Sequence, residues 1–371
     1  MKIIARHLLI FLMTVASVGT ASAQRNIYEV ELELRDHAEV LLGTADLRQK
    51  VQDNKAFSSL LFETLKRPDS YDFPFDSLKS VSILRAEDDA FRIFTWQISH
   101  RADTNQRSYY GNISHYYFGM VQRKIEIGKD SFRTVVIPLI ELNEIPSGVE
   151  NLVLDNQSWL GGLYYQPKFH EGIPKMKFKY FDPTDRKSNG KLKKKKLHYY
   201  LLFGWNGMDN RSNIKFLDVM TFDPKDEERV IFGANVFYFD VLPKFRALFK
   251  YSEYAPFSLN YSYVQAGSKR KLMIVYDHLA TPKMQEKKLE EITELGPDGS
   301  YDALGYNKRS GVIEWFSNVE LAEEFNSKLN RQRIEEQREL FEKQRQAEID
   351  RLKAAGIQLQ PPQESEEDDG Q

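Results

Sequence analysis

From residue 80 onward, apolar side chains recur at every second position in short runs that are separated by turn residues. In the stretch SVSILRAEDDAFRIFTWQIS, Val81 and Ile83 precede an acidic turn, and Phe91 and Ile93 follow it with the same alternation. A period of two is typical of strands, because successive side chains point to opposite faces of a sheet. We therefore predict a β-hairpin here, with its turn at residues 87–89.

Similar runs continue to residue 316, with almost no helical stretch between them. The predicted strands occupy residues 116–122, 133–140, 162–169, 175–180, 197–204, 214–222, 230–239, 246–251, 258–263, 272–276 and 311–316. The chain also contains 19 Tyr and 24 Phe, which favour half-buried pleated surfaces. These features predict an all-β body, an antiparallel meander over residues 80–317.

Two β architectures fit this pattern. A propeller would divide the body into about five blades of roughly 45 residues. Aromatic pairs begin at Tyr116, Tyr164 and Tyr199, and their uneven spacing of 48 and 35 residues does not provide a strict repeat. A meander that closes into a barrel or a sandwich needs no repeat, so both architectures remain open.

Helical patterns flank the β body. In residues 24–79, Phe57, Leu61 and Leu65 share one face of a predicted helix, and Pro68 prevents its continuation. This small N-terminal helical segment is expected to pack against the β body.

A long charged helix is predicted over residues 318–356, because 17 of the 35 residues from 319 to 353 are charged. Its apolar residues form no continuous seam, which favours a solvated helix over a coiled coil. Residues 357–371 are acidic and begin with proline, so we expect a disordered tail.

The N-terminus has the three parts of a secretory signal. Lys2 and Arg6 precede an apolar run over residues 8–18 and the small-residue stretch GTASAQ, which predicts a signal peptide over residues 1–23 with cleavage near Ala23. The apolar run is shorter than the roughly 20 residues of a membrane-spanning helix. We therefore expect a periplasmic or secreted protein, with no transmembrane segment after cleavage.

Composition excludes several classes of function. The chain contains no cysteine, which excludes a thiol nucleophile and thiolate metal ligands. The formal net charge of −2 provides no general attraction to nucleic acid or to anionic membranes. The chain also has no Gly-rich phosphate loop, no His-Glu-x-x-His and no Gly-x-Ser-x-Gly elbow. Whether the protein is an enzyme remains open, although these absences favour a protein that is not.

The stretch LLFGWNGMDNRS carries the first candidate binding residues: Trp205, Asn206, Asn210 and Arg211. Asn206 and Gly207 favour a turn, but the next strand resumes near residue 214, so the connection is longer than a tight hairpin. If Trp205 packs inward, it covers the end of the strand and has a structural role. If it is exposed beside Arg211, it is a stacking platform for a sugar or a peptide.

Two further pairs of residues carry polar chemistry. Asp277 and His278 lie at the end of an apolar strand. They have either an acid–base role or, in the simpler interpretation, they hydrogen-bond to polar groups at the end of the strand. Asp298 and Asp302 lie in GPDGSYDAL, where Pro297-Asp298-Gly299 predicts a turn. Their oxygens are candidate ligands for calcium, although the spacing matches no complete calcium loop.

Five lysines in residues 191–196 form a basic run between two predicted strands. It is either a site for a polyanion such as an envelope polysaccharide or a solvated hairpin tip, and a solvated tip is the simpler interpretation.

Five stretches in this order resemble landmarks of uncharacterised secreted β-rich proteins of Bacteroidota: FRIFTW (91–96), YYFGMVQ (116–122), YYLLFGWNG (199–207), IVYDHLATP (274–282) and GPDGSYDAL (296–304). The resemblance is one of pattern and covers roughly residues 80–316. It implies a Gram-negative envelope setting and carries no activity or catalytic residues.

The sequence as a whole favours an exported, non-enzymatic envelope protein that binds a protein or a glycan partner. The alternative is a glycan hydrolase whose carboxylates, such as Asp277, Asp298 or Asp302, are brought together by the fold.

Overall fold

The computed structural model describes residues 25–43, 45–101, 113–129, 131–187, 190–208, 212–239, 242–253, 255–280 and 295–322. Of these residues, 50% lie in strands and 16% in helices, so the prediction of a mostly β protein with an N-terminal helical segment is confirmed. The predicted signal peptide, residues 323–356 of the predicted charged helix and the acidic tail lie outside the described residues.

Two compact units are distinguished by their internal contacts. The first comprises residues 1–262 and 272–319, and the second comprises residues 263–271 and 320–371. In the second unit, Leu321 forms an isolated bridge with Val264, and the Gln265 amide donates to the Glu320 carbonyl at 2.9 Å. Residues 318–322, where the charged helix was predicted to begin, are therefore not helical.

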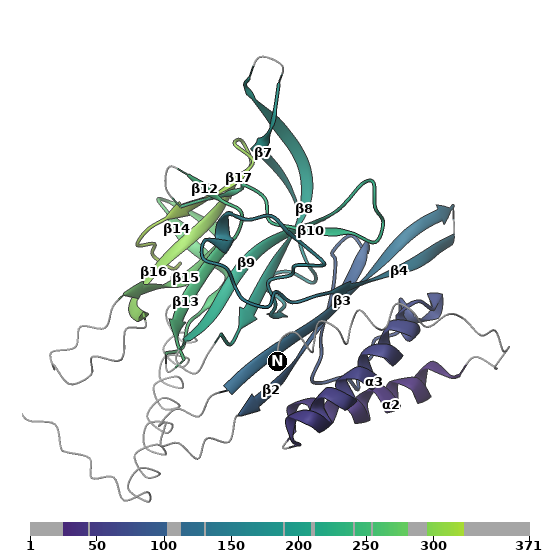
Figure 1. Cartoon of the computed structure of the whole chain (residues 1–371). Helices are drawn as coiled ribbons and strands as arrows, with labels where there is room; N and C mark the ends of the chain where they lie inside the picture. Colours follow the sequence, from purple (N-terminus) through teal and green to yellow (C-terminus); the bar gives the residue numbers. More distant parts are fainter. Residues whose placement is uncertain are drawn as a thin grey trace, which may run out of the picture. The chain divides into compact units, whose positions relative to one another are not determined.

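The N-terminal segment forms two α-helices, α2 (Ile27–Leu42) and α3 (Leu47–Leu65), followed by the short 3-10 helix η2 (Pro68–Ser70). Asn26 caps α2 by accepting from the Tyr28 amide at 3.1 Å. Asp46 caps α3 by accepting from the Gln49 amide at 2.8 Å. Both helices lie against the first sheet (Figure 1). Among the described helices, none is both long and apolar enough to cross a membrane.

The first sheet is an antiparallel meander of β1 (Ser82–Arg85), β2 (Phe91–Arg101), β3 (Ile113–Gly128) and β4 (Ser131–Leu139). The predicted hairpin at residues 87–89 is confirmed, because Arg85 of β1 pairs with Arg92 of β2 across that turn.

The second sheet has the central order β5-β10-β9-β8-β6, with β13 paired to β9 and β7 paired to β8. Its strands are β5 (Leu154–Asp155), β6 (Leu163–Tyr164), β7 (Lys175–Arg186), β8 (Leu192–Asn206), β9 (Ser212–Phe222), β10 (Val230–Phe232) and β13 (Ala247–Ser252).

The third sheet has the order β12-β11-β17-β16-β15-β14. Its strands are β11 (Phe237–Tyr238), β12 (Pro243–Lys244), β14 (Leu259–Ala266), β15 (Lys269–Ala280), β16 (Gly296–Asn307) and β17 (Val312–Phe316). A 3-10 helix, η3 (Val149–Asn151), precedes β5.

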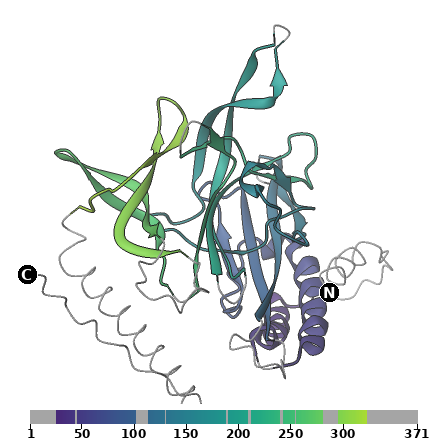
Figure 2. The ribbon, with the colours of Figure 1, turned by 60° about the vertical axis from the view of Figure 1, so that its left-hand side comes forward.

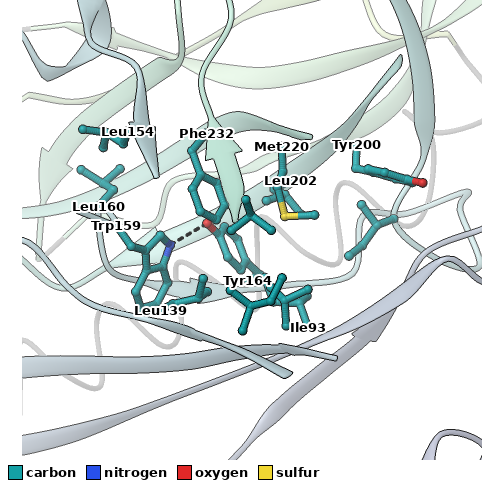
Figure 3. Close-up of a cluster of buried hydrophobic side chains, with 14 of the residues drawn as sticks. Ile93, Leu139, Leu154, Trp159, Leu160, Tyr164, Tyr200, Leu202, Met220 and Phe232 are labelled. Carbon is teal, nitrogen blue, oxygen red and sulfur yellow. Dashed lines mark hydrogen bonds between the residues drawn. The ribbon is translucent and has the colours of Figure 1, made fainter. Parts of the chain in front are cut away.

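Three buried clusters occupy the spaces between these layers in the first unit. The first lies between the helices and the first sheet, and includes Phe57, Phe94 and Trp96. The second lies between the first and second sheets, and Figure 3 shows its Trp159 indole donating to the Tyr164 hydroxyl at 2.8 Å. The third lies between the second and third sheets.

The sheets, which are antiparallel except for the parallel pair β11–β17, are therefore stacked face to face with a half-barrel curl (Figure 2). A propeller would arrange its sheets as radial blades, so the propeller interpretation is wrong. The physical reason is that strands β2, β3, β8 and β9 bury side chains on both faces, so the first and second sheets each pack against a layer on either side.

Several predicted strand boundaries change. Of residues 162–169 only Leu163–Tyr164 is a strand, and residues 230–239 divide into β10 and β11. The largest correction concerns Pro297-Asp298-Gly299, predicted as a turn, which lies within β16. Gly299 accommodates the irregularity there with a φ of 92°, and the buried Ala303 and Leu304 further along anchor the strand between β15 and β17.

Arg92 of β2 is a buried cation between the helical segment and the first sheet. Its guanidinium donates to the carbonyls of Ser70 at 2.6 Å and Phe73 at 2.7 Å, and to Oε1 of Gln122 at 2.7 Å. Gln122 in turn donates to the Leu65 carbonyl and to Ser70 Oγ, each at 2.8 Å. Burial lowers the pKa of Arg92 to about 10. This network ties the end of α3 and the η2 turn to the sheet.

Arg246 and Asp218 form a buried ion pair in the second sheet. Arg246 Nε donates to Asp218 Oδ2 at 3.0 Å, and its other nitrogens donate to the carbonyls of Leu152 at 2.9 Å and Phe232 at 3.4 Å and to that of Val149. Burial raises the pKa of Asp218, and the charge of Arg246 opposes that shift. The pair fixes the loop around η3 to the sheet.

Candidate functional site

Strand pairing in the third sheet brings together two stretches that are distant in the sequence. Tyr276 of β15 pairs with Asp302 of β16, and a bulge follows between Asp277 and Leu279. On the other side of β16, Leu304 pairs with Trp315 of β17. The predicted candidates His278 and Asp302 therefore meet at one place, together with Trp315, which the sequence did not single out as a site residue.

Asp302 is the centre of this cluster, and its carboxylate accepts three hydrogen bonds. The donors are His278 Nδ1 at 3.0 Å, Trp315 Nε1 at 3.3 Å and the Asn318 amide at 2.9 Å. Only 6% of the Asp302 side chain is exposed. A buried carboxylate with three donors is firmly held, so Asp302 orients both rings. We call these residues the His278–Asp302–Trp315 cluster.

His278 lies at the exposed side of the cluster, with 42% of its side chain accessible to solvent. The hydrogen bond to Asp302 raises the pKa of His278 above its usual value, while desolvation opposes that shift and the charges of Asp302 and Asp298 add to it. The imidazole is therefore a donor at the surface that becomes charged more readily than a free histidine.

Asp298 is exposed on the same strand as Asp302. It accepts hydrogen bonds from the amide of Ser300 at 2.9 Å and from its hydroxyl at 2.7 Å. These bonds hold the pKa of Asp298 below its usual range. Asp298 is thus an ionised acceptor near His278.

The calcium prediction at Asp298 and Asp302 gains no support from this geometry. Both oxygens of Asp302 already accept hydrogen bonds from protein donors. Within the described ranges, no group of three or more His, Asp or Glu side chains is arranged to hold a metal ion. Calcium takes six to eight oxygen ligands, and these two carboxylates alone do not supply them, so calcium binding stays a prediction.

Asp277 faces away from His278 and has a different role. Its carboxylate accepts from the Ser258 amide, and its own amide donates to the Ser258 carbonyl at 3.2 Å. Asp277 therefore links β15 to the chain before β14. This agrees with the alternation of side chains along a strand, which places neighbouring residues on opposite faces.

Trp205, the first candidate from the sequence, lies at the end of β8 and packs partly into the second buried cluster. Its ring meets His115 edge to face at 5.9 Å between centroids. The indole also hydrogen-bonds to Tyr251, whose pKa burial raises to about 12. Trp205 therefore acts as packing at a strand end, which favours the inward orientation over an exposed platform.

The residues after Trp205 anchor the strand end. Asn206 is 4% exposed and donates from Nδ2 to the Gly161 carbonyl at 3.0 Å. The Gly207 amide donates to the Tyr117 hydroxyl at 2.7 Å. Asn210 and Arg211, the other candidates in this stretch, lie outside the described residues.

Trp315 is the residue that sequence reasoning missed. It is 39% exposed and its neighbour Phe316 is 44% exposed, although both lie in a strand whose earlier residues Val312 and Ile313 are buried. The feature of the sequence that could have identified Trp315 is the adjacent Trp-Phe pair, which the polar residues Ser-Asn follow. Alternation places the two side chains on opposite faces of the strand, but the exposure of both depends on which layers cover the strand end.

No protein-family model, curated protein or solved structure matches this chain. The functional argument therefore rests on the geometry of the chain itself.

Proposed function

We propose that the protein is an exported, non-enzymatic protein of the cell envelope that binds a glycan through the His278–Asp302–Trp315 cluster. The observation that carries the proposal is an exposed indole whose orientation is set by a buried carboxylate: Trp315 is 39% exposed and donates to Asp302 at 3.3 Å. The secretory pattern of residues 1–23 supports the envelope setting.

The chemistry of the cluster suits a sugar ring. An exposed indole offers an apolar face on which the C–H face of a pyranose can stack. Because Asp302 already holds the ring, little side-chain entropy is lost when a ligand binds. His278 supplies a donor and Asp298 an acceptor for sugar hydroxyls at the rim of the same cluster.

A glycan hydrolase is the alternative, and the cluster favours it less. Hydrolysis needs a carboxylic acid with a raised pKa to protonate the leaving group. The pKa of Asp298 is instead lowered by Ser300, and Asp302 accepts hydrogen bonds from three donors. Asp277 accepts from a backbone amide. These carboxylates are suited to orienting and binding.

Affinity electrophoresis in gels that contain dextran, mannan or xyloglucan tests the proposal. We expect at least one of these neutral polysaccharides to retard the protein, and Trp315→Ala to weaken its binding at least tenfold, which is about 1.4 kcal/mol. Trp315→Phe should retain part of the affinity, because an aromatic face remains.

Phe316→Ala is the matched control, because Phe316 is similarly exposed and adjacent in the strand but points to the opposite face. Its binding should stay within about twofold of the unmodified protein, a difference below 0.5 kcal/mol. Absence of binding to all three polysaccharides, or equal binding by Trp315→Ala, would contradict the proposal. Release of reducing ends from a bound polysaccharide would support the hydrolase instead.

A further inference from the structure

The β7–β8 hairpin projects beyond the rest of the second sheet (Figure 1). Near its base, Tyr200 and Leu202 of β8 belong to the buried cluster between the first and second sheets. His198 and Lys196 continue the same face of β8 outward, because they follow at every second position. The face therefore changes from apolar to basic where the hairpin leaves the core.

The register places basic side chains on both strands of this face. Lys177 of β7 pairs with His198, and Lys179 pairs with Lys196. Residues that are directly opposite in an antiparallel pair share a face, and like charges in that position repel each other. The turn between β16 and β17 lies beside β7, since Lys179 Nζ donates to the Arg309 carbonyl at 3.2 Å, and Lys308 and Arg309 are exposed in that turn. We call Lys177, Lys179, Lys196, His198, Lys308 and Arg309 the basic face.

This positive charge is not neutralised within the described part of the chain. At the base of the hairpin, Lys175 forms an ion pair with Asp88 at 2.7 Å. Among the described residues, no carboxylate forms an ion pair with the lysines or the arginine of the basic face. The nearby Glu314 accepts instead from Asn307 at 2.9 Å and from Ser310 Oγ at 3.0 Å.

The local charge contrasts with that of the whole chain. Residues 175–198 contain ten Lys and Arg but only two Asp, whereas the whole chain carries a formal charge of −2. The positive charge is therefore a property of this hairpin, and the described side chains of Lys177, Lys196 and His198 are exposed on it. Such a surface attracts polyanions at low ionic strength and releases them as salt screens the charges.

We propose that the basic face binds an acidic polysaccharide. Alternate residues of a strand lie about 6.8 Å apart, so Lys177 and Lys179 present charges in a regular row that matches a polymer with repeated anionic groups. Lysine binds carboxylate, sulfate or phosphate as a point charge. Single-stranded nucleic acid is less suitable, because it requires aromatic side chains exposed among the cations for base stacking. Among the side chains of this face that the structure describes, the aromatic Tyr200 is only 4% exposed.

The test compares alginate, a polymer of carboxylated sugars, with neutral dextran. The protein should bind alginate at low salt, and the affinity should fall as the salt concentration rises. The triple variant Lys177→Gln, Lys179→Gln, Lys196→Gln should lose at least tenfold in affinity. A second triple variant, Lys79→Gln, Lys129→Gln, Lys225→Gln, removes the same charge from exposed positions elsewhere and should stay within about threefold.

Other outcomes overturn the proposal. Equal losses of alginate affinity in the two triple variants would show that only net charge matters. Absence of alginate binding would contradict the proposed site. Tighter binding of a thymidine oligonucleotide than of alginate would assign the face to nucleic acid. Trp315→Ala should bind alginate normally, because the basic face does not rest on the His278–Asp302–Trp315 cluster. Failure of one proposal is thereby distinguishable from failure of the other.

Discussion

The Arg246–Asp218 pair and the His278–Asp302 pair each join a side-chain nitrogen to a carboxylate oxygen across 3.0 Å, but their surroundings differ. Arg246 and Asp218 are 0% and 1% exposed. In the other pair, 42% of the His278 side chain is exposed and 6% of Asp302. Equal distances therefore do not mean equal roles.

The difference follows from solvent. In the interior both partners have lost their hydration, so neither tolerates the loss of the other. At the surface, water screens the attraction and solvates a partner that is left alone. The buried Arg246–Asp218 pair is thus a structural requirement, whereas in the second pair the exposed His278 is accessible to a ligand.

Asp218→Asn should have the largest effect, because it leaves the Arg246 charge buried without a counter-charge. We expect a loss of about 3–5 kcal/mol in the free energy of unfolding, measured by urea denaturation. Asp69→Asn is the control, since Asp69 pairs with Arg67 at 2.6 Å but is 51% exposed. A loss of about 0–1 kcal/mol is expected there. Similar losses of unfolding free energy at both positions would show that burial does not distinguish the two ion pairs.

Gln122→Leu tests a buried cation that is held without a carboxylate. The substitution removes an acceptor from Arg92 and removes the Gln122 donor from the Leu65 carbonyl and from Ser70 Oγ. We expect about 1–3 kcal/mol of destabilisation, less than for Asp218→Asn, because no counter-charge is lost. Gln157→Leu, at an exposed position, should change stability by no more than about 0.5 kcal/mol. If Gln122→Leu were neutral, the network would not anchor the helical segment.

The smallest effect is expected at His278 and depends on pH. Because Asp302 raises the pKa of His278 in the folded state, its contribution is complete below the unfolded pKa of about 6.5. The contribution is then lost as the pH rises through the higher folded pKa. His278 is 42% exposed, so we expect less than about 1 kcal/mol.

Urea denaturation from pH 5 to pH 9 measures this contribution. The difference in unfolding free energy between the protein and His278→Gln should shrink as the pH rises. A difference that grew with pH would show that the imidazole is neutral in the pair. His198→Gln serves as the control, because His198 is exposed on the β7–β8 hairpin.

The sequence by itself determined several local elements of this protein, although not the strand at Pro297-Asp298-Gly299. Alternation at Val81, Ile83, Phe91 and Ile93 predicted the first hairpin, and the stripe at Phe57 and Leu61 predicted a helix. Both elements are local, because the apolar and polar pattern of neighbouring residues sets the period of side-chain burial. The stacking of the sheets was not predictable in this way, since it depends on which face of each strand meets another layer.

The candidate site was decided by tertiary structure. The sequence marked Asp277 and His278, and separately Asp298 and Asp302, but only the register of β15 with β16 brought His278 to Asp302. Trp205 was also a binding candidate, but the structure packs it partly against the second buried cluster.

Trp315 became a candidate only because the end of β17 is left uncovered. Exposure and cross-strand contact depend on residues far apart in the chain. Local periodicity therefore specified the elements, and long-range packing specified which of their side chains are accessible to a partner.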